Sequence, residues 1–163
     1  MFKPNHFNVK EMVDEQVYNL LGEQAWNLID IRIRKTQQVL KDVFGWIIIV
    51  NTWMFSTNKY GQFSHRGFRA AVSDVGSKGG SHYKGMGLDF DAYIDGQRLD
   101  PDLVRKRILD NIDMFPYIRC LEIDINWIHI DVMGWLDHEK RSSITDNKIL
   151  LYSPEGNSKI IRR

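Results

Sequence analysis

Two histidines and several carboxylates stand on short segments of the sequence at spacings that suit metal chemistry. In SHYKGMGLDFD (81–91), His82 is followed seven positions later by Asp89, with Gly85 and Gly87 between them. Glycine adopts backbone conformations that other residues avoid, so the chain can turn sharply here and bring Asp89 back toward His82. A second histidine, His129, lies in the strand-like segment WIHIDV (127–132).

Two histidines and one carboxylate are a ligand set for a hydrolytic zinc ion, which takes three protein ligands and keeps a fourth position for water. The metal lowers the pKa of that water, and a nearby free carboxylate can accept its proton. Each side chain also has an ordinary explanation. His82 suits a surface loop, Asp89 a solvated strand face, and His129 a hydrogen-bonded core position. The spacing alone leaves the metal site and the incidental reading open.

The alternation of apolar residues indicates which polar side chains share a face of a sheet. In 88–93 and 127–132 the apolar residues stand at even positions, whereas in 121–125 they stand at odd positions. The reversal predicts a bulge or tight turn near residues 126–127, a feature often found beside active sites. If the sheet brings these segments together, one polar surface collects His82, Asp89, Glu122, Asp124 and His129.

The segment Ser81-His82-x-x-Gly85-x-Gly87-x-Asp89 resembles the SxHxxGxAxD signature of the LAS metallopeptidases, peptidase family M15, with Gly87 where alanine is commoner and the serine directly before the histidine. Residues 126–131, with Trp127 and His129, resemble the second signature of that family. HFNVKEMV near the start, NTW (51–53) and GFR (67–69) resemble its phage-encoded branch, so the resemblance covers roughly residues 5–135.

This resemblance implies Zn²⁺ held by His82, Asp89 and His129. It also implies that Arg69 lies near the substrate and supports an oxyanion or grips a carboxylate. Many members carry a catalytic acid three residues before the last histidine, where this chain has Asn126. Because asparagine cannot act as a base, Glu122 is the first candidate for that role and Asp124 the second.

The remaining candidates belong to the surroundings of the metal. Ser81, Tyr93 and Trp127 are expected, with Arg69, to contact the substrate. Tyr93, Trp127 and Asp131 could equally orient a ligand histidine or serve the fold alone.

Helices come first in the predicted order, and strands dominate the middle of the chain. Asn8 and Glu11 suit a capping box before a helix ending at Gly22, and a second helix is expected from Asp30 to Phe44. A buried strand at 46–53, a loop at 54–80, a strand at 88–95 and a helix from Asp100-Pro101 follow. Segments 120–125 and 127–132 are predicted strands, and the end is a hairpin around 154–156 or a loose tail.

This order predicts a single α+β domain, a central antiparallel sheet with flanking helices like that of the hedgehog and D,D-peptidase folds. We expect the peptidase domain to cover residues 1–136, and residues 137–163 to be a C-terminal extension packed on it.

The composition excludes several classes of protein. The 163 residues are 43% hydrophobic, and 22 basic residues oppose 21 acidic ones, which argues against a dedicated nucleic-acid binder. The single cysteine excludes an intramolecular disulfide and a cysteine-based zinc cluster. No signal-peptide core or membrane-spanning stretch is apparent, so we expect synthesis in the cytoplasm without membrane insertion.

The leading functional prediction is a phage-related zinc peptidase that cleaves the peptidoglycan stem peptide, as a D-Ala-D-Ala carboxypeptidase or an L-Ala-D-Glu endopeptidase. Such an enzyme would act on the cell wall after lysis or as part of a virion with virion partners. Two alternatives stay open: a zinc-containing, non-catalytic virion or wall-binding protein, and a globular protein without a metal.

Overall fold

The computed structural model describes residues 2–70, 80–133 and 148–162. It is an α+β domain built on a mixed seven-stranded open sheet. The described elements are the α-helices α1 (Val9–Met12), α2 (Glu15–Leu21), α3 (Ile31–Phe44) and α4 (Pro101–Asp110), the short 3-10 helices η1 (Gly22–Leu28), η2 (His82–Lys84) and η3 (Ile112–Met114), and the strands β1 (Ile47–Ile49), β2 (Gly87–Ile94), β3 (Gln97–Arg98), β4 (Cys120–Glu122), β5 (Ile128–Asp131), β6 (Lys148–Tyr152) and β7 (Ser158–Arg162).

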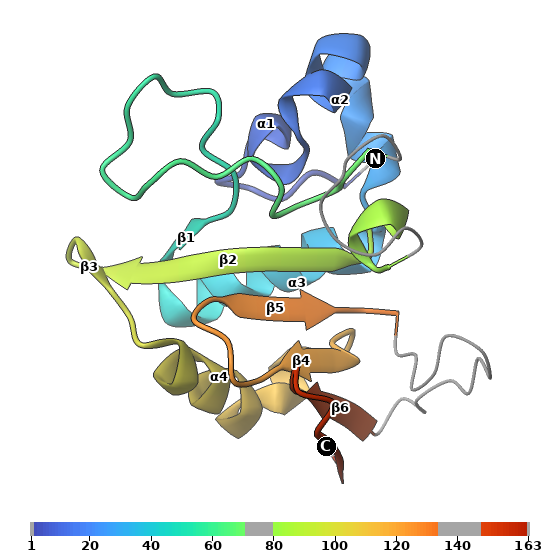
Figure 1. Ribbon diagram of the computed structural model, residues 1–163, viewed down its shortest axis with the longest axis vertical. Helices are drawn as coiled ribbons and strands as arrows, with labels where there is room; N and C mark the ends of the chain where they lie inside the picture. Colours follow the sequence, from blue (N-terminus) through green and yellow to red (C-terminus); the bar gives the residue numbers. More distant parts are fainter. Residues whose placement is uncertain (1, 71–79, 134–147, 163) are drawn as a thin grey trace.

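The strands follow the order β1-β2-β5-β4-β6-β7, and the two-residue β3 pairs with β2 (Figure 1). The predicted sheet was antiparallel, and one pair differs, because β6 joins β4 in parallel. β6 and β7 form an antiparallel hairpin whose turn is closed by a bond from the Ser153 amide to the Asn157 carbonyl, 2.8 Å long. The chain end is thus a hairpin in the same sheet. The proposed domain boundary at residue 136 lies outside the described residues.

One face of β2 forms the core and the other carries the polar side chains. Leu88 and Phe90 are fully buried in the same apolar cluster as Ile33 and Leu40 of α3, which crosses behind β2 in Figure 1. Asp89 and its neighbours at odd positions point to the opposite side, as the alternation predicts. Burial of the apolar side chains therefore fixes which face of the sheet carries the polar side chains, Asp89 among them.

The predicted first helix is in fact two helices, and the reason is Asp14. Its Oδ1 accepts a hydrogen bond from the amide of Val17 at 2.9 Å and caps α2, while Val13 stays extended and bridges to Phe68. The expected N-cap is confirmed. The Asn8 side chain accepts a hydrogen bond from the Lys10 amide, and the Glu11 carboxylate, in the wall of a cavity, accepts one from the Asn8 amide as a capping box requires.

The strand expected at 46–53 is shorter and lies at the sheet edge. β1 keeps only three residues, because the amide of Asn51 bonds to the Glu11 carbonyl and that of Thr52 to the Phe63 carbonyl. Ile47 is 39% exposed, so the strand is not fully buried as its composition suggested. The helices at Asp30 and Asp100 begin as predicted, each capped by its aspartate side chain.

Candidate metal centre

The pairing of β2 with β5 places two of the three predicted ligands side by side. Asp89 stands directly opposite His129 in the antiparallel register, so their side chains leave the same face of the sheet. His82 opens η2 and reaches the same point from the segment before β2. The sheet register and the turn at 81–86 together bring these distant residues to one place.

The turn depends on the two glycines of the motif. Gly85 has a φ of 66°, and a Cβ there would lie 1.8 Å from the Leu28 carbonyl oxygen. A Cβ at Gly87 would lie 2.4 Å from Ser81 Oγ. No other residue fits Gly85 without displacing the backbone of 28–29, which explains why the path from His82 to Asp89 needs glycine.

The three candidate ligand atoms lie close enough to share one ion. His82 Nε2 is 3.2 Å from His129 Nδ1 and 3.2 Å from Asp89 Oδ1, and His129 Nδ1 is 2.6 Å from that oxygen. Ligand atoms around a tetrahedral zinc, at bonds of about 2.0–2.1 Å, are separated by about 3.3 Å. Two of the three separations match this value. The third is a hydrogen bond that would lengthen by about 0.7 Å when an ion takes the place of its proton.

Groups behind the ligands orient them. His82 Nδ1 lies 2.7 Å from the Gly67 carbonyl, which can only accept, so this nitrogen carries the proton and Nε2 offers a lone pair. Arg69 Nη2 donates to Asp89 Oδ2 at 2.9 Å, and His129 Nε2 faces Asp131 Oδ2 at 3.9 Å. Such outer contacts hold ligands in the orientation that a metal needs.

The electrostatics of the group keep the Asp89 carboxylate ionised. Burial disfavours the charged form of His129, yet the charge of Asp89 and the contacts with Asp131 raise the pKa of this imidazole to about 10. Burial likewise opposes the ionisation of Asp89, but the two imidazoles outweigh it and hold its pKa well below the usual value. A metal ion that binds here would therefore meet an ionised carboxylate and would have to displace the proton of His129.

The three residues open onto a cavity of about 340 Å³. A cavity of this size is in the range of small-ligand sites in proteins. Its lining consists of Arg69, Gly80, Ser81, His82, Tyr83, Asp89, Glu122, Trp127 and His129.

Glu122 reaches this cavity, as the strand phase predicts. The register pairs Leu121 with Ile130, which brings the next residue, Glu122, to the level of His129 and on the same face. Burial raises the pKa of the Glu122 carboxyl, with Asp89 and Asp131 adding to the rise. Within the described residues its carboxylate makes no hydrogen bond or ion pair, so it is free to exchange a proton.

The second candidate for the base does not reach the cavity. Asp124 is exposed, has a φ of 61° in the loop between β4 and β5, and is not among the lining residues. Asn126 is also exposed, and its carbonyl accepts a hydrogen bond from Arg98. The phase reversal arises from this loop, residues 123–127, rather than from a bulge in a continuous strand.

The predicted substrate residues divide into two groups. Arg69, Ser81 and Trp127 line the cavity. Arg69 is already engaged with Asp89 and with the His65 carbonyl, at 2.5 Å from Nε. Tyr93 is not in the lining and instead packs on Tyr60, with ring centroids 4.5 Å apart.

Sequence reasoning missed the groups that hold the loop over the cavity. The buried Arg105 of α4 donates from Nη1 to the Trp127 carbonyl at 2.8 Å and from Nη2 to the Ile125 carbonyl at 2.7 Å. Arg98 donates a hydrogen bond to the Asn126 carbonyl, which lies between these two in the chain. The amphipathic pattern of 101–110 gives no sign of this role, because an arginine on a helix is usually solvated.

Comparison with protein-family models, with curated proteins and with solved structures gives no match for this chain. None of the helices in the described ranges is long and apolar enough to cross a bilayer. Fold and site together define an α+β protein with a buried His-Asp-His group that could bind a metal ion.

Proposed function

We propose that the protein is a zinc-dependent peptidase that hydrolyses a peptide bond in the peptidoglycan stem. The observation that carries this proposal is the convergence of three ligand atoms, all within 4.8 Å of one another, on a cavity that also contains a free carboxylate. The resemblance of 81–89 and 126–131 to the two signatures of the LAS metallopeptidases supports the choice of substrate.

The donor set favours zinc among the common divalent ions. Two imidazole nitrogens and one carboxylate oxygen suit zinc, whereas calcium and magnesium prefer oxygen ligands throughout. A zinc ion held by three protein ligands supplies a position for water and lowers the pKa of that water. His82, Asp89 and His129 are the residues that would hold it.

The chain's own residues then supply the rest of the chemistry. The Glu122 carboxylate takes a proton from the attacking water and passes it to the leaving nitrogen as the C–N bond breaks. The rise in its pKa favours the second step, because a carboxyl that holds a proton more tightly stays protonated until the leaving nitrogen takes it. Arg69 keeps the Asp89 carboxylate in place and brings positive charge to the cavity wall, where negative charge develops on the carbonyl oxygen.

The test compares zinc-loaded wild type with Glu122→Gln and Asp124→Asn on purified peptidoglycan, with products identified by mass spectrometry. Asp124→Asn is the matched control, since it removes a carboxylate two residues further along the chain but outside the cavity, and asparagine tolerates its positive φ. We expect Glu122→Gln to bind zinc normally and to lose about 10²- to 10⁴-fold in turnover, and Asp124→Asn to stay active.

Two results would contradict parts of this proposal. Stoichiometric zinc without release of any muropeptide fragment would reject the peptidase and favour a non-catalytic virion or wall-binding protein. Equal turnover by wild type and Glu122→Gln would remove Glu122 from its role while leaving the metal site intact.

A further inference from the structure

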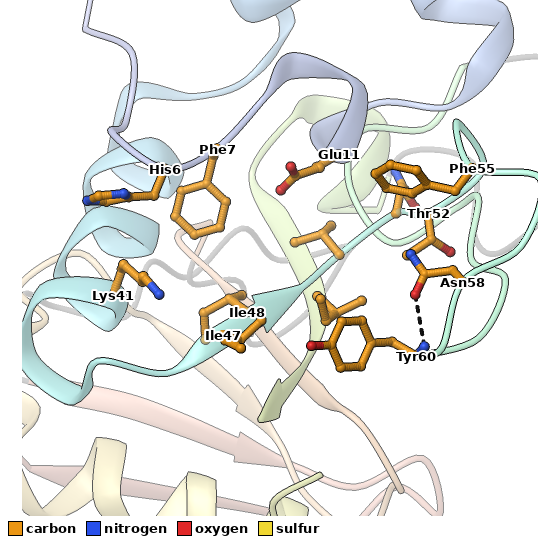
Figure 2. Close-up of a pocket in the computed structure, with 13 residues that line it drawn as sticks. His6, Phe7, Glu11, Lys41, Ile47, Ile48, Thr52, Phe55, Asn58 and Tyr60 are labelled. Atoms are coloured by element: carbon orange, nitrogen blue, oxygen red, sulfur yellow. Dashed lines mark hydrogen bonds between the residues drawn. The ribbon is translucent and has the colours of Figure 1, made fainter. Parts of the chain in front are cut away.

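A second cavity, of about 440 Å³, lies along β1 and is separate from the metal centre. β1 is the outermost strand of the sheet, and the cavity lies between this strand, the N-terminal segment and the loop after β1 (Figure 2). No residue lines both cavities. The lining consists of His6, Phe7, Glu11, Lys41, Ile47, Ile48, Ile49, Val50, Asn51, Thr52, Phe55, Asn58 and Tyr60.

The lining combines apolar and aromatic walls with one carboxylate. Figure 2 shows the Glu11 carboxylate facing the space between the rings of Phe7 and Phe55. Phe55 is 52% exposed, although a large apolar side chain of this kind is usually covered. The cavity therefore offers a ligand both apolar walls and polar groups.

The backbone of Glu11 is fixed, whereas its carboxylate has no cationic partner among the described side chains. Its amide donates to the Asn8 carbonyl at 3.0 Å, and its carbonyl accepts from the Asn51 amide at 3.1 Å. The carboxylate accepts a hydrogen bond from the Asn8 amide, and no side chain in the described ranges bonds to it. Lys41, the lysine in the cavity lining, donates instead to the Trp46 carbonyl at 3.0 Å.

A carboxylate that is partly removed from water without a cation beside it is destabilised in its charged form. Burial accordingly raises the pKa of Glu11 to about 7, although the hydrogen bond from the Asn8 amide works against the rise. A cationic donor placed in the cavity would remove that penalty, and the faces of Phe7 and Phe55 would attract the same charge. An alkyl chain attached to the cation would pack against the isoleucines of β1.

We propose that the β1 cavity is a second binding site, which takes a primary alkylammonium group through Glu11 and the surrounding aromatic rings. The group could belong to a free amine or to a lysine-like side chain, and the chemistry of recognition is shared by both. This inference does not depend on the proposed peptidase activity.

Isothermal titration calorimetry on the full-length protein at pH 8 tests the proposal. The probes are n-pentylamine, N-acetyl-lysine methylamide and the uncharged N-acetyl-norleucine methylamide. We expect saturable 1:1 binding of at least one charged probe and none of the norleucine probe. Preference for the amine or for the lysine derivative distinguishes the two sources of the group.

The variants separate this site from general attraction and from the metal centre. Glu11→Gln keeps the side-chain shape and an acceptor oxygen but removes the negative charge, so it should weaken binding of the ammonium about tenfold or more. Glu15→Gln, an exposed carboxylate on α2 outside the cavity, is the matched control and should bind normally. Phe55→Ala removes an exposed ring and should weaken binding without disturbing the core.

Three outcomes would overturn the inference. The first is that neither charged probe binds saturably up to roughly 10 mM. The second is that wild type and Glu11→Gln bind a charged probe with equal affinity. The third is that the norleucine probe binds as well as the charged probes. Loss of binding in His82→Ala would also overturn it, because the probe would then occupy the metal centre.

Discussion

Replacement of Glu11 by glutamine should change how the stability of the protein depends on pH. Burial raises the pKa of this carboxyl from 4.5 to about 7 in the folded state. The other titratable groups lining its cavity are His6, Lys41 and Tyr60. Between the two pKa values the native state holds more protons than the unfolded state, so the free energy of unfolding falls as pH rises through this window. Glutamine does not titrate and removes that loss.

The size of the effect follows from the two pKa values. A difference of about 2.5 between them corresponds to at most ~3.4 kcal/mol of lost stability above pH 7, at 1.36 kcal/mol for each unit. The cavity is open to water, and solvent screening reduces this to roughly 1–2 kcal/mol. The loss should be small at pH 5 and nearly complete at pH 8.

Urea unfolding at pH 5 and pH 8 measures this difference for wild type, Glu11→Gln and the control Glu15→Gln. We expect the stability of Glu11→Gln relative to wild type to rise by roughly 1–2 kcal/mol between the two pH values. The control should show no such change. If the free energies of unfolding of Glu11→Gln and wild type differ by the same amount at both pH values, the Glu11 carboxylate is not buried in the folded state.

Three further predictions concern the metal centre and the core. Zinc at about 100 times its Kd should add about 2.7 kcal/mol and raise Tm by roughly 5–11 °C in differential scanning calorimetry; a similar rise in His82→Ala would contradict the site. Gly87→Ala should lower the free energy of unfolding by about 1–3 kcal/mol and weaken zinc binding, because the new Cβ meets Ser81 Oγ at 2.4 Å. Adding Ser81→Gly to this variant should restore stability and zinc affinity. Failure to restore them would reject this contact as the cause. Gln37→Met should stabilise the protein by about 1 kcal/mol in urea unfolding, because this fully buried amide has no hydrogen-bond partner within the described ranges; a loss of stability would indicate a buried water there.

Local sequence signals predicted the elements whose ends are set by their own residues. Asp30 and Asp100 cap α3 and α4 as expected, and Gly45 ends α3 in the left-handed conformation. The signals failed where a distant contact decides the structure. β1 ends early because Glu11 and Phe63 accept the amides of Asn51 and Thr52, and the composition of 46–53 contains no trace of those partners.

The candidate ligands were predictable because strand alternation is a local property. In their own strands, Asp89 and His129 point away from the face that carries the apolar neighbours. Once the two strands pair, both side chains therefore lie on the same face of the sheet. Strand alternation does not choose between Glu122 and Asp124, since it places both on one face. The loop at 123–127 decides between them, because it turns Asp124 into solvent.

The sequence by itself determined the composition of the site: which residues could bind an ion, which strand faces carry them, and where glycine must replace a side chain. These depend on residue type and on the two-residue period of a strand. Only the tertiary structure decided the register of β2 against β5, the capture of Arg69 by Asp89, and the cavity around Glu11. Each of these depends on contacts between segments far apart in the chain, whose energies no local pattern contains.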